Sequence, residues 1–224
     1  AAVNGISGIR RIEGFDASDQ RSQVAGQVPS FHPSDFLSPK LLDQIDRFAQ
    51  LALLASKLAL EDAGGLDSYD PGRVAVSIGS GMGGFGTFES SAIRKFRNQP
   101  VPPFTVPRTM ANSAAAWVAI KHRFTGVNLT CSTACSSGAN AIGMALDLLR
   151  SGRADVVVAG GAEACVLPLT MTSFEILRAL STGFNTDPER ASRPFAKGRD
   201  GFVMSEGAGI LILEREEWAK QRGA

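Results

Sequence analysis

Residues 154–159, Ala-Asp-Val-Val-Val-Ala, form a short run that is apolar apart from Asp155. A strand with no polar side must be covered on both faces, which is typical of a sheet that lies between layers of helices. Similar runs at residues 73–78 and 210–213 predict two more strands. Apolar residues recur at helical spacing between residues 39 and 64, and again between the strands predicted at 73–78 and 154–159. This alternation of strands and helices predicts a layered α/β fold.

Length and composition favour a globular protein with a substantial core. The chain has 224 residues, of which 44% are hydrophobic, and a formal net charge of +1. Its scattered charges give no basis for a nucleic-acid or membrane surface, and no apolar run approaches the roughly 20 residues of a membrane span. The N-terminus lacks the pattern of a signal peptide. With three cysteines, these features predict a cytoplasmic protein with free thiols.

Residues 128–139 deliver a cysteine from a short strand to the start of a helix. The strand is expected at 127–130, and apolar residues at helical spacing follow, so Cys135 lies in or just before the first helical turn. Backbone N–H groups and the positive end of the helix dipole meet there and favour a thiolate over a thiol. The hydroxyl side chains that crowd this turn are Ser132, Thr133, Ser136 and Ser137. Cys135 is therefore the candidate nucleophile.

Two other roles for Cys135 are less consistent with the sequence. A free cysteine is most often a small buried residue, but a purely structural cysteine needs no such concentration of hydroxyl groups. Metal binding would require more ligands at suitable spacing. Cys131 and Cys135 lack the two-residue spacing of a zinc knuckle, and no second cysteine or histidine pair completes a site. No metal site is predicted.

The glycine-rich residues 79–84 follow a predicted strand and match the dinucleotide-binding fingerprint. They raise a nucleotide-binding oxidoreductase as an alternative function. That fingerprint expects a second strand with an acidic end about 20 residues further on, but residues 102–107 are a proline-rich loop. A packing or pocket role for these glycines is therefore favoured.

A cysteine hydrolase normally carries its own histidine base. This chain has only His32, in an irregular N-terminal segment, and His122, which is expected at a solvated helix end. Neither is a convincing partner for Cys135. The chain is expected to hold a nucleophile without its acid–base groups.

Three segments are expected to be turns or loops. Glycines and prolines interrupt the first forty residues, which should wrap a surface rather than build a core. Residues 160–163 should form a tight turn in which Glu163 accepts hydrogen bonds from backbone donors. Residues 193–202 should form an ordered loop held by charge pairs.

Several motifs, in order along the chain, resemble those of the β-ketoacyl-acyl-carrier-protein synthases, most nearly the synthase II type. They are residues 132–138 (Ser-Thr-Ala-Cys-Ser-Ser-Gly), 159–163 (Ala-Gly-Gly-Ala-Glu), 178–182 (Arg-Ala-Leu-Ser-Thr), 192–195 (Ser-Arg-Pro-Phe) and 199–203 (Arg-Asp-Gly-Phe-Val). The resemblance implies a thiolase-like, layered αβαβα fold. Residues 1–224 would be its N-terminal domain, incomplete at both ends.

The resemblance also implies roles for four residues. Cys135 matches the acyl-accepting nucleophile, and its backbone N–H would be half of the oxyanion hole. Phe174, Met82 and Val106 match positions of the acyl pocket, and Val106 lies close to the dimer partner. The implied protein is a homodimer that receives acyl and malonyl thioesters from acyl carrier protein, with no metal and no cofactor.

The implied activity is that of a 3-oxoacyl-[acyl-carrier-protein] synthase in fatty-acid elongation. Thiolate attack on an acyl thioester gives an acyl-enzyme; malonyl carrier protein then decarboxylates, and its carbanion attacks the acyl group. In this family two histidines, a lysine and the second oxyanion donor come from the C-terminal half, so this chain alone is expected to be acylated slowly at most. The alternatives are a polyketide-type ketosynthase and a non-catalytic partner subunit of a condensing heterodimer. The retained Cys135 argues against the second.

Overall fold

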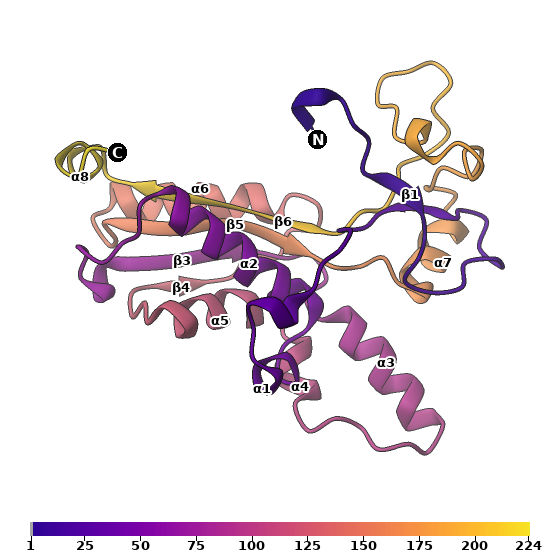
Figure 1. Cartoon of the computed structure of the whole chain (residues 1–224), viewed down its shortest axis with the longest axis horizontal. Helices are drawn as coiled ribbons and strands as arrows, with labels where there is room; N and C mark the ends of the chain where they lie inside the picture. Colours follow the sequence, from indigo (N-terminus) through magenta and orange to yellow (C-terminus); the bar gives the residue numbers. More distant parts are fainter. Residues whose placement is uncertain (1) are drawn as a thin grey trace. The chain divides into compact units, whose positions relative to one another are not determined.

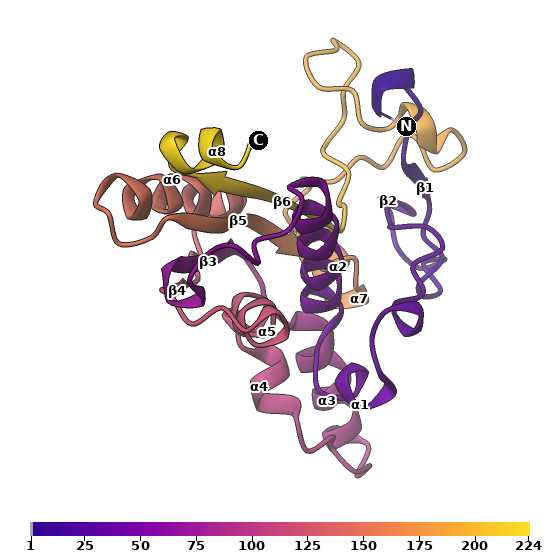
Figure 2. The same cartoon turned by 60° about the vertical axis from the view of Figure 1, so that its left-hand side comes forward.

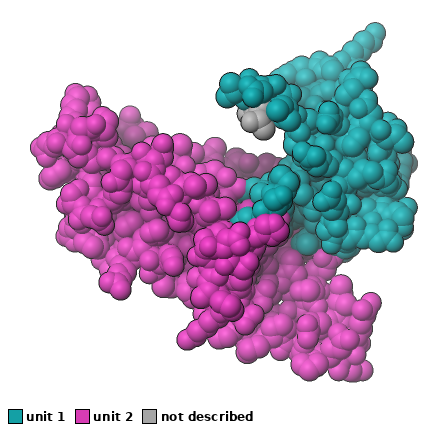
Figure 3. Space-filling view, in the orientation of Figure 1, with its two compact units in different colours: residues 1–31, 164–207 teal, residues 32–163, 208–224 magenta. Residues whose placement is uncertain are grey.

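The structure is a computed structural model that describes residues 2–224, and it divides into two compact units (Figure 3). Unit 1 comprises Ala1–Phe31 and Ala164–Gly207, and unit 2 comprises His32–Glu163 and Ala208–Ala224. Among the described residues, no helix has the length and apolar character needed to cross a membrane.

The α-helices are α1 Pro39–Leu42, α2 Arg47–Asp62, α3 Phe85–Phe96, α4 Thr105–Thr109, α5 Ser113–His122, α6 Ser137–Arg150, α7 Pro168–Ile176 and α8 Glu216–Gln221. The strands are β1 Ile9–Arg11, β2 Val24–Gly26, β3 Val74–Gly79, β4 Asn128–Leu129, β5 Val156–Glu163 and β6 Gly207–Glu214. Short 3-10 turns occur at Ala2–Asn4, Pro33–Asp35, Pro71–Arg73 and Pro188–Arg190.

A four-stranded sheet in the order β4-β3-β5-β6 forms the centre of unit 2 (Figure 1). β3 runs parallel to both β4 and β5. Just outside β5 and β6, Arg215 donates a backbone hydrogen bond to Asp155, whereas within the strands Gly160 lies against Gly209. From Asp155 to Gly160 the residue numbers on β5 rise, while those of the facing residues fall from Arg215 to Gly209. β6 therefore runs antiparallel to β5.

Helices cover both faces of this sheet, with α6 on one face and α2 and α5 on the other (Figure 2). Ala75 and Val157 are paired across β3 and β5 and belong to the apolar cluster under α6. Val76 and Val158, one residue further along each strand, point to the opposite face. Every residue of β3 is buried. The prediction of apolar strands covered on both faces is confirmed for β3 and for residues 156–159 of β5. It is wrong for residues 210–213, because no residue of β6 is buried and Leu211 is 51% exposed.

Two helical boundaries differ from the prediction. The expected single helix before Gly64 is interrupted after α1, because Asp46 adopts an extended conformation and caps α2 by accepting a hydrogen bond from the Phe48 N–H. The predicted proline-rich loop contains the short helix α4, and the next helix, α5, starts at Ser113. A proline in the first turn of a helix removes no hydrogen bond, which is why α4 accommodates Pro107.

The predicted turn at residues 160–163 is wrong, because β5 continues through them to Glu163. Glycine in this segment permits close approach of neighbouring backbones. A Cβ at Gly160 would overlap the carbonyl oxygen of Gly209 on β6. These glycines keep the strand in the sheet, although the same residues are typical of turns.

The N-terminal segment contributes to the core of unit 1, which corrects the prediction of a surface wrap. β1 and β2 pair antiparallel, and Val24 and Ala25 are fully buried. The Ser22 N–H donates to the Glu175 carboxylate at 2.7 Å, and Gly26 forms a bridge with Ser205. Unit 1 is thus assembled from two distant parts of the chain.

The start of α6 lies directly against the ends of β3 and β5. A Cβ at Gly79 would overlap the carbonyl oxygen of Ser137, and a Cβ at Gly161 would lie 2.9 Å from the Gly138 Cα. Backbones can approach this closely only where no side chain intervenes. The packing role predicted for the glycine-rich residues is confirmed at Gly79.

We therefore expect Gly79→Ala to destabilise the chain by about 1–3 kcal/mol, because the added methyl group pushes α6 away from the sheet. The free energy of urea unfolding measures this loss. Gly143→Ala, within α6 and with no atom within 4 Å of the new Cβ, is the control. It should stabilise the chain by up to about 1 kcal/mol. Equal unfolding free energies for the two variants would contradict the packing argument.

Candidate functional site

Cys135 lies in the turn between β4 and α6, as predicted. α6 begins at Ser137 with Ser136 as its N-cap, so the cysteine comes just before the helix, and its side chain is exposed. The preceding Ala134 has a φ of 53°, in the left-handed region that costs a residue with a Cβ about 1 kcal/mol. Such strained backbone is retained only where surrounding contacts hold it, and it occurs often at functional sites.

A network of hydrogen bonds holds this strained turn. The buried hydroxyl of Ser137 donates to the Ala134 carbonyl at 2.6 Å and accepts from the Thr133 N–H at 2.9 Å. The Ser136 hydroxyl donates to the Thr133 carbonyl at 2.7 Å. From one helical turn further on, the Asn140 amide donates to the Thr133 hydroxyl at 2.6 Å. The hydroxyl groups therefore fix the backbone and leave the thiol at the surface.

The three free cysteines have different environments. Cys165 is buried, Cys131 is half-buried with its sulfur 3.9 Å from the Thr133 hydroxyl, and Cys135 is exposed. A buried structural role fits Cys165 and does not fit Cys135. Within residues 2–224, no cluster of three or more His, Cys, Asp or Glu side chains could hold a metal ion.

The glycine-rich loop after β3 lies next to the turn that carries Cys135. The Ser80 N–H donates to the Cys131 carbonyl at 3.1 Å, which connects this loop to the segment between β4 and the nucleophile. Glu163, at the end of β5, accepts hydrogen bonds from the Gly81 N–H at 2.7 Å and from the Met82 N–H at 3.2 Å. The prediction that Glu163 satisfies backbone donors is confirmed, although it does so from a strand.

The predicted pocket residues fall in both units. Met82 is half-buried in the glycine-rich loop of unit 2, and Val106 lies on α4 of the same unit with its side chain 70% exposed. Phe174 lies on α7 in unit 1, where its ring packs edge-on against Phe202 with centroids 5.3 Å apart. Unit 2 thus holds Cys135, Met82 and Val106 together, and the pocket roles stay predictions.

His122 is half-buried, which corrects the prediction of a solvated helix end. Its ring stacks on Phe124 with centroids 5.5 Å apart, and burial, aided by the nearby Lys121 charge, lowers the pKa of the imidazole. It lines a cavity of about 370 Å³ together with Val74 at the start of β3. The Cys135 turn packs at the other end of β3, so His122 is no base for the thiol.

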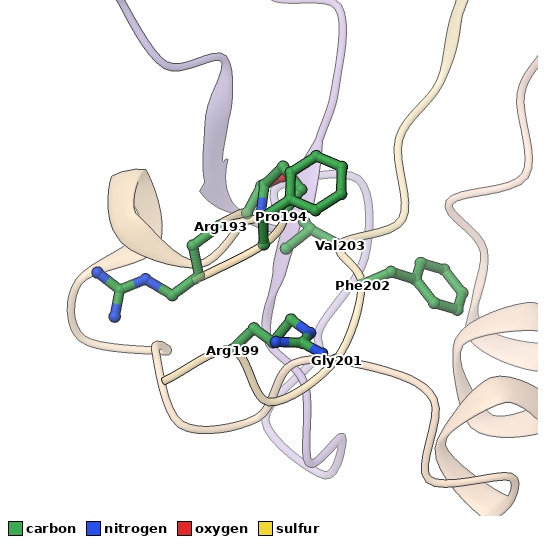
Figure 4. A pocket seen from close by; sticks show the side chains of 8 residues that line it. Arg193, Pro194, Arg199, Gly201, Phe202 and Val203 are labelled. Carbon is green, nitrogen blue, oxygen red and sulfur yellow. The ribbon is translucent and has the colours of Figure 1, made fainter. Parts of the chain in front are cut away.

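A separate cavity of about 790 Å³ lies in unit 1 and is lined by Arg193 and Arg199 (Figure 4). The Arg193 guanidinium lies 4.8 Å from the centroid of the Phe184 ring, and Arg199 donates to a backbone carbonyl. Asp200 accepts from the Ser181 hydroxyl at 2.7 Å. Stacking and hydrogen bonds to neutral groups hold this loop, so the prediction of charge pairs is wrong.

Sequence reasoning missed the contributions of Asn140 and Ser80. Asn140 follows Ser136 by four residues, a spacing that places the two on the same face of a helix, and its amide donates to the Ser136 hydroxyl at 3.2 Å. That spacing could have revealed its contact with the turn. Ser80 gives no comparable signal, because its partners come from distant segments.

Comparisons with known proteins find related sequences and structures. Residues 2–219 match the family model described as Beta-ketoacyl synthase, N-terminal domain. The chain is 42% identical over 227 residues to the 3-oxoacyl-[acyl-carrier-protein] synthase 2 of Vibrio harveyi, in an alignment that covers 100% of this chain and 54% of that protein. The chain therefore spans about half the length of the curated relatives it matches.

Two solved structures are also similar. A β-ketoacyl synthase from Burkholderia phymatum STM815 has a TM-score of 0.88 and 32% identity, covering 99% of this chain and 55% of that one. A type II polyketide acyl-carrier protein in complex with its ketosynthase gives a TM-score of 0.84 and 35% identity, covering 99% and 54%.

Replacement of Ser137 tests the hydrogen-bond network of the turn. Ser137→Ala removes one buried donor and one buried acceptor contact, so we expect the free energy of unfolding to fall by about 1–3 kcal/mol. The exposed Ser90, whose hydroxyl donates to the Thr87 carbonyl on α3, is the control. Ser90→Ala should change stability by less than about 0.5 kcal/mol. Equal free energies of unfolding for Ser137→Ala and Ser90→Ala would contradict a stabilising role of this network.

Proposed function

We propose, because this chain belongs to the β-ketoacyl synthase family, that it is the nucleophile-bearing N-terminal half of a 3-oxoacyl-[acyl-carrier-protein] synthase. Its likeness to solved ketosynthases confirms the predicted thiolase-like α/β fold class. The proposed activity is acyl transfer followed by decarboxylative condensation in fatty-acid elongation. A relative named 3-oxoacyl-[acyl-carrier-protein] synthase 2, at 42% identity, supports this over other acyl-transfer reactions.

The observation that carries the proposal is the exposed thiol of Cys135 at the start of α6. Reactive cysteines are often found at helix starts, in polar and accessible surroundings. The strained Ala134 and the hydroxyl network fix the backbone beside it. An exposed and fixed thiol at a helix start is suited to repeated acylation and deacylation.

The proposed reaction has two steps. The Cys135 thiolate attacks the carbonyl carbon of an acyl thioester; an S–C bond to the enzyme forms, and the carrier thiolate leaves. Malonyl carrier protein then loses CO2, and the electron pair of the broken C–C bond forms a new bond to the acyl carbon as the bond to Cys135 breaks. We assign the acid–base groups for the second step to a part of the protein that corresponds to the remaining length of the relatives, because neither His32 nor His122 is a convincing partner for Cys135.

We assign the acyl pocket to Met82, Val106 and Phe174, on the strength of the family motifs. The proposed partner is acyl carrier protein, because one structural neighbour is a ketosynthase in complex with such a protein. We further propose that the intact protein is a cytoplasmic homodimer.

A polyketide-type ketosynthase is the second candidate. One observation favours it: the ketosynthase of a type II polyketide system is 35% identical to this chain and has a TM-score of 0.84. A non-catalytic partner subunit is less consistent, because Cys135 is retained and exposed.

Acylation of Cys135 tests the nucleophile assignment. The intact protein that carries this chain is incubated with an acyl carrier-protein thioester, and its mass is measured. We expect the wild-type protein and a Cys131→Ala control to gain one acyl group, and Cys135→Ala to gain none. Equal labelling of wild type and Cys135→Ala would overturn the assignment.

A further inference from the structure

Glu163, the last residue of β5, accepts hydrogen bonds from several residues of the glycine-rich loop. Its Oε1 accepts from the Ser80 hydroxyl at 3.0 Å and from the Met82 N–H at 3.2 Å, and its Oε2 accepts from the Gly81 N–H at 2.7 Å. The carboxylate is half-buried, and these three donors are neutral. Hydrogen bonds to an ionised group are stronger than those between neutral groups. Glu163 therefore fixes three consecutive residues of the loop.

Ser80 extends this contact to Cys131, in the segment between β4 and the nucleophile. Its side chain is only 2% exposed; its hydroxyl donates to Glu163 and accepts from the Gly83 N–H at 2.9 Å. Its backbone N–H donates to the Cys131 carbonyl. A displacement of Glu163 would therefore be transmitted to the chain four residues before Cys135.

A second route passes through Gly81. A Cβ at Gly81 would lie 3.0 Å from the Glu163 carboxylate and 3.3 Å from the Ala134 carbonyl oxygen. The Gly81 backbone thus lies close to both Glu163 and the strained Ala134. Without space for a side chain, movement of the loop must be accommodated by Ala134 or by Glu163.

We infer that Glu163 is a positioning residue that holds the Gly81–Met82 backbone against the Cys135 turn. Through Ala134 it fixes the orientation of the thiol. Through the N–H of Met82 it fixes a side chain that the proposed function places in the acyl pocket. Glu163 thus couples the reactivity of Cys135 to the choice of acyl chain, and only the second effect rests on the proposed function.

Glu163→Gln distinguishes this role from simple space filling. A glutamine has the same shape but offers one oxygen acceptor, and its NH2 group would face an N–H or hydroxyl donor. At least one of the three donors then loses its partner. Glu214→Gln is the control: Glu214 is a carboxylate at the end of β6 that accepts from the Tyr69 hydroxyl at 3.0 Å and from the Arg222 guanidinium at 2.8 Å. Because β6 is antiparallel to β5, this control lies at the opposite end of the sheet.

The first measurement is the rate at which iodoacetamide alkylates Cys135 in the intact protein, followed by peptide mass spectrometry. We expect Glu163→Gln to slow alkylation roughly tenfold, since one charge-assisted hydrogen bond is lost. Glu214→Gln should react at the wild-type rate. Circular dichroism melting shows whether each variant is folded at the assay temperature. A wild-type rate in folded Glu163→Gln, or equal slowing in both variants, would overturn the link to the thiol.

The second measurement is the ratio of kcat/KM for a short and a long acyl carrier-protein thioester. Glu163→Gln should shift this ratio, whereas loss of stability alone lowers both values together. An unchanged ratio would overturn the link to Met82. The proposed function fails separately, if the wild-type protein forms no acyl-enzyme, because alkylation by iodoacetamide needs no carrier protein.

Discussion

Contact between the backbone of α6 and the ends of β3 and β5 is the constraint on which the candidate site depends. Gly79, Gly138 and Gly161 meet there, and added Cβ atoms at Gly79 or Gly161 would enter neighbouring backbone. Because this contact fixes where the helix begins, it also fixes the residue just before the helix, Cys135. A longer distance between helix and sheet would leave the thiol without a defined backbone geometry.

Hydrogen bonds of polar side chains add to the close packing in fixing the turn that carries Cys135. Ser137 is buried at the contact itself, and its hydroxyl holds the left-handed Ala134 in place. On the other side of the turn, Glu163 fixes the loop in which Gly81 leaves little room for a side chain beside Ala134. The strain at Ala134 is thus maintained from two directions. Such fixed geometry suits a nucleophile, since little reorganisation is needed when charge develops on it.

The sequence predicted most of what hydrophobic periodicity controls: the buried strands β3 and β5, α6, and a cysteine just before that helix. It failed where one residue type serves two purposes. Gly160 and Gly161 have the composition of a turn, but they lie in β5 because neighbouring backbones approach them closely. The contacts of Ser80 could not be predicted, since its partners are distant in sequence. His122 was misjudged because its burial depends on packing against Phe124.

The central claim is that close backbone packing under α6 determines the reactivity of Cys135. The most direct test is the rate of Cys135 alkylation by iodoacetamide in folded Gly79→Ala, with Gly143→Ala measured beside it. The added methyl group should displace the helix start from the sheet, disturb the turn that carries the thiol and slow the reaction severalfold, while the control reacts like wild type. Alkylation of folded Gly79→Ala at the wild-type rate would contradict the account.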